Sequence, residues 1–191
     1  MKRAAVALLA VVVLAAGCRT GRPGGAPIAP LTASTSEEAM QQLRARRAEF
    51  GGVKSLMRVR ATTNGKTQSF RAQLAVHDAQ RMDLIAYTPV GTTALKLHAD
   101  GARVTTEPEV PPGSFDFLRV TGLAPAEVGM LLVGLPPRDD LQVQFAPMGL
   151  ASASAGEITV TFDPPSYPAK RVVVTRGADR IEIEHLEVAS E

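Results

Sequence analysis

The sequence has a single cysteine, no tryptophan and few other aromatic residues, with 2 tyrosines and 6 phenylalanines among 191 residues. One cysteine excludes an internal disulfide, so the core of the folded protein must be stable through burial alone. The scarcity of aromatic rings argues against a surface that stacks bases or sugars. An excess of one charge is also missing, because the formal net charge is only +2. The composition therefore indicates no nucleic-acid partner.

Residue patterns that carry out chemistry are missing too. The histidines His77, His98 and His185 are scattered and form no pair at the spacing of metal ligands. No serine lies in a nucleophile-elbow motif. The residues thus favour a protein that is not an enzyme, and we expect no catalytic residue, no metal and no cofactor.

The first residues form a short apolar run behind a positive start. Lys2 and Arg3 precede an unbroken stretch of Ala, Val and Leu over residues 4–14. This run is too short to cross a bilayer, which takes about 20 apolar residues. A positive start, an apolar stretch and small residues before a cut site are typical of an export signal. We therefore predict that residues 1–17 are a signal peptide, and that the mature chain is close to neutral because Lys2 and Arg3 are removed.

The stretch Leu14-Ala15-Ala16-Gly17-Cys18 resembles the lipobox of bacterial lipoproteins. The resemblance implies that Cys18 is acylated, becomes the mature N-terminus and anchors the protein in a membrane, since several acyl chains hold far better than one. In such lipoproteins an acidic residue after the cysteine is associated with the inner membrane. Arg19 at that position implies delivery to the outer membrane, where the protein faces the periplasm. An ordinary secretory signal with an unmodified Cys18 is the alternative.

Residues 18–33 are rich in Gly, Pro and Ala, and we predict a lipidated cysteine followed by a flexible tether. A single domain over residues 34–191 follows. Its first helix starts at Ser34 to Glu38, where hydroxyl and acidic side chains suit a helix N-terminus. Gly51-Gly52 ends it. Because its apolar face is thin, we expect this helix to lie across another element.

Alternation with a period of two dominates the rest of the domain. Met57 and Val59 alternate with Arg58 and Arg60, which is typical of a strand with one apolar and one wet face. Asn64-Gly65 predicts a tight hairpin. Further strands are expected around residues 70–76, 82–86, 95–97, 104, 141–145, 158–162, 172–174 and 181–188. The phase slips at Glu184-His185, which indicates a bulge or the end of that strand.

Helices interrupt this run of strands. Ser114 can begin a short helix over residues 115–118, and Pro125 suits the first turn of a second helix. That second helix has an apolar stripe and ends near Gly134. There are no βαβ units, which argues against a doubly wound parallel fold. We predict a mainly β, α+β fold, in which helices cover the concave face of a curved antiparallel sheet, or incomplete β-barrel, and leave an apolar cavity.

Residues 87–97, Tyr-Thr-Pro-Val-Gly-Thr-Thr-Ala-Leu-Lys-Leu, resemble the outer-membrane lipoprotein receptor family of the Lol system (LolB). Residues 118–122, 125–136, 158–170 and 181–183 are similar to other stretches of that family. The resemblance implies the LolA/LolB-like fold, a monomer, and binding of the acyl chains of lipoproteins. It also implies that a soluble periplasmic carrier delivers these lipoproteins, and that this protein helps to insert them into the outer membrane.

The family has an exposed loop leucine that enters the membrane, and the matching residue here is Val90, between Pro89 and Gly91. Valine keeps the apolar character but is shorter. The alternative is that these three residues only form a tight turn. The family carriers also have a cavity arginine that latches a helical lid. Arg58 or Arg60 matches it, and the sequence does not decide between them.

We expect apolar side chains from the strands and from the second helix to line the cavity. Burying one CH₂ group stabilises by about 0.8 kcal/mol, so such a lining can hold acyl chains. The alternative for each residue is ordinary core packing. The expected lining residues are Met57, Val59, Phe70, Leu74, Met82, Leu84, Leu95, Leu97, Val104, Val128, Leu131, Leu132, Val143 and Val160.

Two other functions stay open at this point. A structural or assembly lipoprotein could use the same fold to bind a protein partner, with its cavity closed. A periplasmic enzyme is the third hypothesis, and no residue pattern supports it. Acyl chains that co-purify with the protein would favour the first hypothesis over the second.

Overall fold

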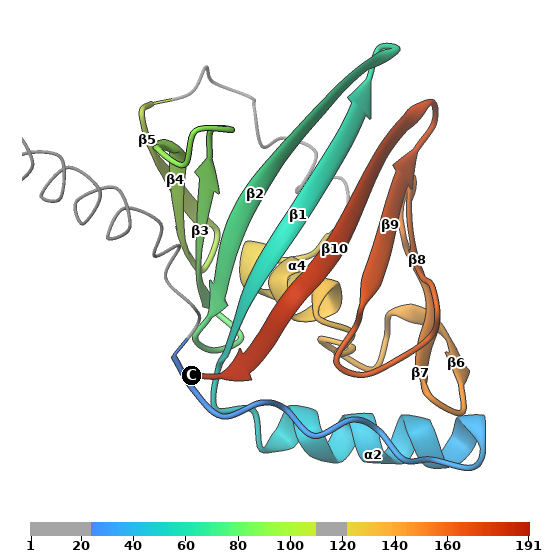
Figure 1. The fold of residues 1–191 in the computed structure, drawn as a ribbon. Coiled ribbons are helices and arrows are strands. Elements are labelled where there is room, and N and C mark those ends of the chain that lie inside the picture. Colours follow the sequence, from blue (N-terminus) through green and yellow to red (C-terminus); the bar gives the residue numbers. More distant parts are fainter. Residues whose placement is uncertain (1–23, 110–121) are drawn as a thin grey trace, which may run out of the picture.

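The computed structural model describes residues 24–109 and 122–191. Its strands form one antiparallel sheet in the order β5-β4-β3-β2-β1-β10-β9-β8-β7-β6 (Figure 1). Cys18 and the helix expected over residues 115–118 lie outside the described residues. The strands are β1 Val53–Thr63, β2 Lys66–Val76, β3 Arg81–Tyr87, β4 Thr93–Asp100, β5 Arg103–Glu107, β6 Gln142–Ala146, β7 Gly149–Ala155, β8 Ile158–Phe162, β9 Arg171–Arg176 and β10 Asp179–Ser190.

Short turns explain the antiparallel order. Asn64 and Gly65 both have positive φ angles, 51° and 73°, as a two-residue hairpin between β1 and β2 requires. The expected irregularity in the last strand is a bulge. Leu56 of β1 pairs with Glu187 of β10, while the next residue, Met57, pairs with His185, so Leu186 is the extra residue.

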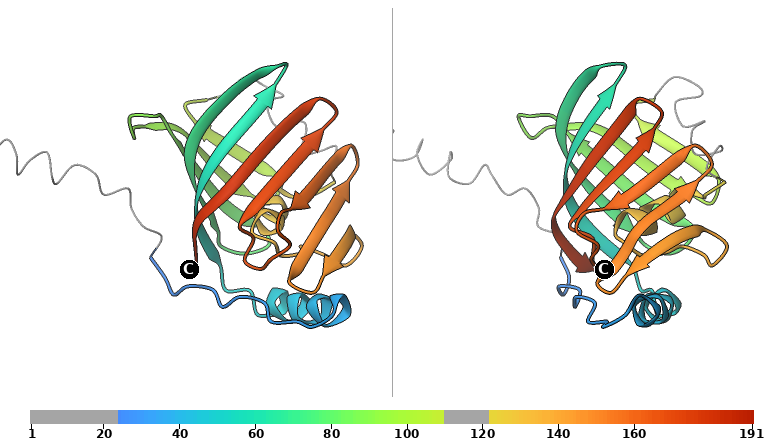
Figure 2. Two further views of the ribbon diagram at one scale, coloured as in Figure 1. Left: turned by 45° about the vertical axis from the view of Figure 1, so that its right-hand side comes forward. Right: turned by 90° about the vertical axis from the view of Figure 1, so that its right-hand side faces the viewer.

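The sheet curves strongly but does not close into a barrel (Figure 2). β5 and β6 are its two edges, and no pairing among the described residues joins them. The central pairing of β1 with β10 connects the N-terminal and C-terminal halves of the sheet. The predicted mainly β class with one curved antiparallel sheet is confirmed.

The two described helices occupy different places. α4, Pro125–Leu132, lies within the concave side of the sheet and contacts β2, β3 and β4 (Figure 1). α2, Ser36–Ala48, lies across one end of the sheet, where it contacts β6 and β7. It begins with Thr35, whose hydroxyl accepts a hydrogen bond from the Glu38 N–H, and it buries only Ala39 and Leu43. No helix among the described residues is both long enough and apolar enough to cross a membrane.

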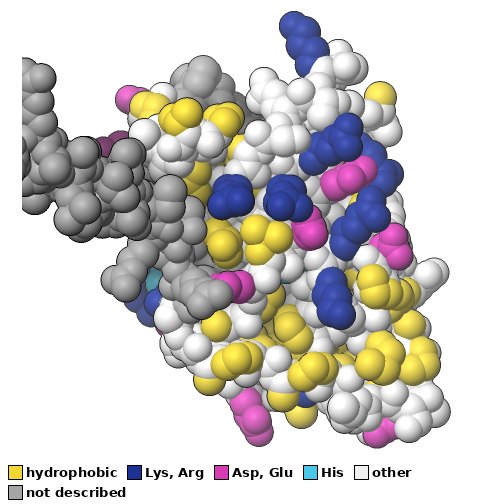
Figure 3. All heavy atoms as spheres, viewed as in Figure 1, with side chains coloured by type: hydrophobic (Ala, Val, Ile, Leu, Met, Phe, Trp, Pro, Cys, Tyr) yellow, Lys and Arg dark blue, Asp and Glu magenta, His cyan; other side chains and the backbone are white. Residues whose placement is uncertain are grey.

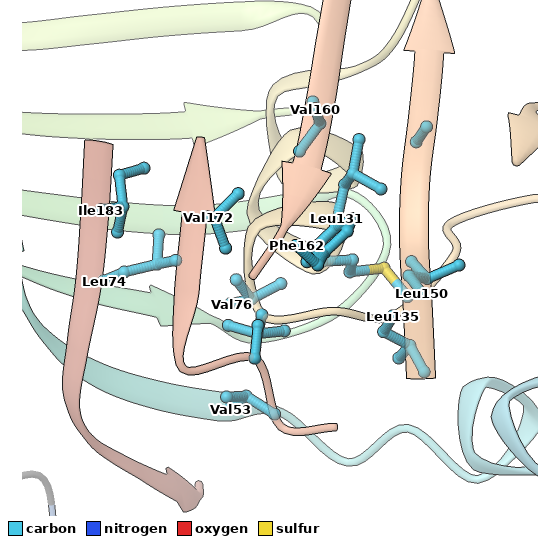
Figure 4. Packing of buried hydrophobic residues seen from close by; sticks show 14 of the residues in the cluster. Val53, Leu74, Val76, Leu131, Leu135, Leu150, Val160, Phe162, Val172 and Ile183 are labelled. Carbon is cyan, nitrogen blue, oxygen red and sulfur yellow. The ribbon is translucent and has the colours of Figure 1, made fainter. Parts of the chain in front are cut away.

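One apolar core joins α4 to the concave face. Leu131 and Leu135 pack near Phe162, Leu150 and Val172, which come from β8, β7 and β9 (Figure 4). Gly129 permits the close approach of α4 to the sheet, because a Cβ atom there would lie 2.7 Å from Cγ2 of Val76. The concave face therefore holds α4 tightly at one end.

Residues 24–33 differ from the expected flexible tether. Pro27 pairs with Ala189 of β10, and Leu31 and Ala33 are buried. Arg46 of α2 donates hydrogen bonds to the carbonyls of Ala29 and Pro30. Because this segment gains backbone pairing and apolar burial, it lies against the domain instead of standing free.

Candidate functional site

The strand register brings the expected lining residues together on the concave face. Val59 lies opposite Phe70, and Leu74 lies opposite Leu84, which in turn lies opposite Leu97. Residues opposite each other in an antiparallel sheet point to the same side. The lining residues predicted on the strands thus form one continuous apolar surface, which we call the inner face.

Part of the inner face is covered by α4. Leu74, Val76, Met82 and Leu97 are all buried, with Leu74 at 1% exposure and Val76 at 0%. Met57, Val59 and Val160 are buried as well. For these residues the structure favours core packing over a free lining.

The part of the inner face nearer the β1–β2 and β9–β10 turns is less covered. Phe70, Leu95 and Val174 are half-buried, and Ile181 is 37% exposed. Ala61 of β1 lies opposite Ile181 of β10 and is half-buried too. Both hairpins extend well past α4 (Figure 1). The inner face therefore has a packed end and a more open end.

The remaining predicted lining residues lie at the margins of the inner face or on α4. Leu131 of α4 is 2% exposed and belongs to the core. Five others are half-buried and pack against that core: Leu84, Val104, Val128, Leu132 and Val143. The structure thus places every predicted lining residue on the inner face or on the helix that covers it.

One polar contact interrupts the apolar interior. His185 Nδ1 lies 2.6 Å from the Ser55 hydroxyl, and its Nε2 lies 3.0 Å from the carbonyl oxygen of Leu132, near the end of α4. Ser55 is fully buried. Burial lowers the pKa of His185 to about 4, although its bond to the Leu132 carbonyl opposes the shift. The ring is therefore neutral at pH 7, and Nε2 carries the hydrogen that it donates to Leu132.

Sequence reasoning missed this contact. A lone histidine in a strand gives no signal of its partner 130 residues earlier in the chain. The bulge at Leu186 was the available sign, because it moves His185 into register with Met57 on the inner face. Ser55 is fully buried, and the His185 ring connects it to the Leu132 carbonyl of α4.

Val90 lies in the turn between β3 and β4, where it is 84% exposed, more than any other large apolar side chain of the described residues. Pro89 and Gly91 flank it, and Gly91 has a positive φ of 86°. The Gly91 N–H donates to the Thr88 carbonyl, so the turn is closed by its own hydrogen bonds. The turn holds Val90 away from the domain.

Neither candidate for the latching arginine faces the interior. Arg58 and Arg60 alternate with the buried Met57 and Val59, so they lie on the convex face. Arg58 is bound there to Glu184 at 2.6 Å. The expected role of Arg58 or Arg60 in a lid latch is wrong, and a polar contact from the sheet to a helix is instead made by His185 with Leu132, in addition to the apolar core.

A second polar cluster lies on the outside of β3 and β4. Asp83 accepts from His77 and from His98 at 2.7 Å each, and His77 also contacts Glu191 at 2.7 Å. The Asp83 carboxylate raises the pKa of His77, and Glu191 adds to this effect. Within residues 24–109 and 122–191, no three His, Cys, Asp or Glu side chains are placed to hold a metal ion.

Among solved structures, the chain is similar to a LolA superfamily protein from Nitrosomonas europaea, with TM-score 0.48, 7% identity, and coverage of 83% of this chain and 94% of the other. It is also similar to a putative outer membrane lipoprotein-sorting protein domain from Vibrio parahaemolyticus. For this structure the TM-score is 0.46 and the identity 11%, and the match covers 81% of this chain and 91% of the other. A third similar structure is a DUF1329 family protein from Desulfovibrio piger, with TM-score 0.47, 8% identity, and coverage of 83% of this chain and 94% of the other.

No curated protein matches the chain. Residues 55–190 match the family described as "Protein of unknown function (DUF3261)". The chain belongs to that family.

Proposed function

We propose that this DUF3261 protein is a membrane-anchored protein that binds the acyl chains of lipoproteins on its inner face and helps to insert these lipoproteins into the outer membrane. Cys18 is the lipid anchor, and the domain faces the periplasm as a monomer. A soluble periplasmic carrier delivers the cargo. We include in this proposal the LolB-like role that the sequence of residues 87–97 implies.

The observation that carries the proposal is the open end of the inner face. Apolar side chains there come from neighbouring strands on both sides of β1, yet Phe70, Leu95 and Val174 keep part of their surface exposed. Exposed apolar surface gathered in a concavity is typical of a ligand site. The described residues around it offer aliphatic and aromatic carbon, which fits a hydrocarbon chain.

The energetics also fit reversible binding. Each CH₂ group moved from water to this surface contributes about 0.8 kcal/mol, so part of one acyl chain suffices for useful affinity. Only the open end is available, because α4 and its core contacts already fill the other end. A cargo that is held by part of its chain can leave again for a membrane.

Val90 supports the delivery step. The β3–β4 turn lies at the same end of the strands as the β1–β2 turn, since β3 runs antiparallel to β2. The turn is therefore at the open end of the inner face. An apolar side chain that is 84% exposed at that end can enter the acyl region of a bilayer while cargo moves across.

Val90→Glu tests the delivery step. A carboxylate at the turn tip opposes entry into a bilayer, so we expect lipoproteins to stop arriving at the outer membrane, as measured by membrane fractionation. The fold should persist, because Val90 makes little contact with the domain. Met148→Glu is the matched control: Met148 is 49% exposed in the β6–β7 turn at the other end, so this variant should deliver normally. Normal delivery by Val90→Glu would overturn the role of the turn.

A specific observation also favours a second candidate, the structural or assembly lipoprotein. One end of the inner face is packed against α4 in a single core cluster, as a closed cavity would require. In that case the domain would hold a protein partner and bind no acyl chain. Acyl-chain binding by the purified protein separates the two functions.

A further inference from the structure

We propose that the convex face of the sheet binds the phosphate headgroups of an anionic lipid surface, and that this face sets the orientation of the domain on the membrane that holds its anchor. This proposal deepens the proposed function and rests on it for the identity of the membrane. The face, which we call the arginine face, consists of Arg58, Arg60, Arg71, Arg171 and Arg180, together with Glu182 and Glu184.

The strand register gathers these arginines. Arg71 of β2 lies directly opposite Arg58 of β1, and Glu184 of β10 lies between Arg58 and Arg171 of β9. All five arginines are exposed. Figure 3 views this face and shows Lys and Arg side chains gathered over β1, β10 and β9. Because the mature chain is close to neutral overall, this is a local concentration of positive charge.

The arginines outnumber the carboxylates that could neutralise them. Glu182 is contacted by Arg180 at 2.8 Å and by Arg171 at 3.4 Å, Glu184 is bound by Arg58, and Asp163 lies 3.7 Å from Arg171. Arg60 lies opposite Glu182 in the register but makes no ion pair with it, and Arg71 makes none with any carboxylate of the described residues. Arg58 and Arg71 are also like charges placed directly opposite, an arrangement that is unfavourable in a sheet. An anion that contacts both would relieve this repulsion.

A groove beside these residues offers room for a headgroup. It has a volume of about 670 Å³ and is lined by Arg58, Arg60, Lys170 and Arg171 on the basic side. The groove is also lined by Asp163, Glu182 and Glu184. Because these carboxylates reduce the net positive charge, binding there depends on directed hydrogen bonds from arginine more than on net charge. Phosphate oxygens match the planar fork of the guanidinium in this way.

The turn that carries Val90 lies beside the arginine face. Arg71 pairs with Tyr87, the last residue of β3 before that turn. In the right panel of Figure 2, the green β3–β4 turn projects to the left, on the convex side of β1 and β2. An exposed apolar tip next to exposed arginines is the pattern of a surface that contacts both the acyl and the headgroup layers of a bilayer.

The attachment point restricts the domain to the same orientation. Pro27 pairs with Ala189 near the C-terminal end of β10. Residues 19–26 separate Pro27 from Cys18, and a chain of this length spans at most about 30 Å. An acylated Cys18 therefore keeps this end of the sheet close to the bilayer. The β3–β4 turn is at the other end of the strands, so both contacts are made together when the strands lie along the membrane surface.

Because the chain between the domain and Cys18 is short, the lipid surface is favoured over an acidic protein as the partner. A membrane is always within reach of the anchored face, and its phosphates repeat in two dimensions as the arginines do. An acidic protein partner would need carboxylates at the same spacing, and nothing in the described residues points to one.

Binding to vesicles tests the proposal. The mature chain, residues 18–191 with Cys18→Ser, is mixed with phosphatidylcholine vesicles with or without phosphatidylglycerol, and the bound fraction is measured by flotation. We expect binding only to the anionic vesicles, and binding should weaken as salt is raised. Arg60→Glu/Arg71→Glu should lower the affinity for anionic vesicles at least about tenfold.

The matched control is Arg103→Glu/Arg176→Glu, which makes the same change in net charge. Both residues are exposed. Arg103 is on the edge strand β5, and Arg176, at the end of β9, follows Thr175, which pairs with Arg180, so alternation places Arg176 on the other side of the sheet. We expect this variant to stay within about twofold of the parent, because a localised contact contributes more than net charge. Far-ultraviolet circular dichroism verifies that both variants are folded.

Several outcomes would overturn the proposal. These are failure of the parent to bind anionic vesicles, equal losses in the two double variants, or binding that is the same with and without phosphatidylglycerol. Binding of the mature chain to an acidic protein and not to the vesicles would overturn it as well. The assay uses neither the anchor nor an acyl cargo, so its failure is distinct from a failure of acyl-chain binding.

Discussion

His185 is the residue whose chemistry depends most on the fold. Its ring joins β10 to the last turn of α4 through the Leu132 carbonyl and joins β1 through Ser55. Both bonds form with a neutral ring, and burial makes a charged ring unfavourable there. The contact therefore stabilises the position of α4 only while His185 is neutral.

This predicts a loss of stability in mild acid. The pKa of His185 falls from 6.5 to about 4 on folding. Between pH 6.5 and about pH 4, His185 is therefore protonated in the unfolded chain but neutral in the folded protein. The free energy of unfolding should fall by at most about 3 kcal/mol across this window. Urea unfolding at several pH values between 7 and 4 measures it.

His185→Asn should lower stability at pH 7 and remove most of this pH dependence. The control is His98→Asn, which changes an exposed histidine on the convex side and leaves the contact of His185 with α4 intact. Below pH 6.5 the contribution of His77 to stability is constant, because its raised pKa gives stability that is fully present there and is lost only as the pH rises through the folded pKa. An unchanged slope in His185→Asn would show that the ring does not control acid stability.

At the scale of elements, α4 decides how much of the inner face is free. Its Gly129 allows the helix to approach β2 and β3, with Val76 Cγ2 at 2.7 Å and Met82 Sδ at 3.2 Å from the position that a Cβ atom would take. A side chain there would push α4 away from the sheet.

Gly129→Ala is therefore expected to destabilise the domain. Alanine is better than glycine within a helix by about 1 kcal/mol, but overpacking costs about 1–3 kcal/mol, so a net loss of about 1 kcal/mol should appear in chemical unfolding. If the clash with Val76 is the cause, Gly129→Ala/Val76→Ala should lose less stability than the sum of the two single variants. Additive losses, or a gain in stability from Gly129→Ala alone, would contradict the packing described here.

Most elements could be predicted from the sequence because local signals agreed with the tertiary structure. Asn64-Gly65 predicted its hairpin, and Pro125 predicted the start of α4. The phase slip at Glu184-His185 predicted a bulge or the end of the strand, and the structure has a bulge. β7 was missed because its sequence, Gly-Leu-Ala-Ser-Ala-Ser-Ala, has small residues on both faces and so hardly alternates. Its place in the sheet comes from its pairing with β6 and β8, which no local pattern reveals.

The candidate site was only partly predictable, for the same reason. Alternation assigned the apolar residues to one face, and the structure brings them together. It also placed Arg58 and Arg60 on the opposite face, which the family resemblance overrode. Alternation does not tell which of Leu74 and Phe70 lies under α4, because that depends on where a helix from elsewhere in the chain docks.

At the scale of the whole molecule, the two sides of the curved sheet have separate tasks in our account. The inner face holds acyl chains at its open end, and the convex face lies on lipid headgroups. The Val90 turn lies where these two sides meet at one end of the strands. A cargo chain that leaves the open end would therefore emerge beside the membrane.

Acyl-chain binding by the unacylated mature chain is the most direct measurement of this account. A fluorescent fatty acid is titrated in the absence of detergent against the parent, Ala61→Phe and Thr62→Phe. Ala61 points into the open end and Thr62 to the convex side, so Ala61→Phe should weaken binding about tenfold by displacing roughly two CH₂ groups, while Thr62→Phe should bind as the parent does. No binding by the parent, or equal binding by all three proteins, would contradict the claim that the inner face receives hydrocarbon.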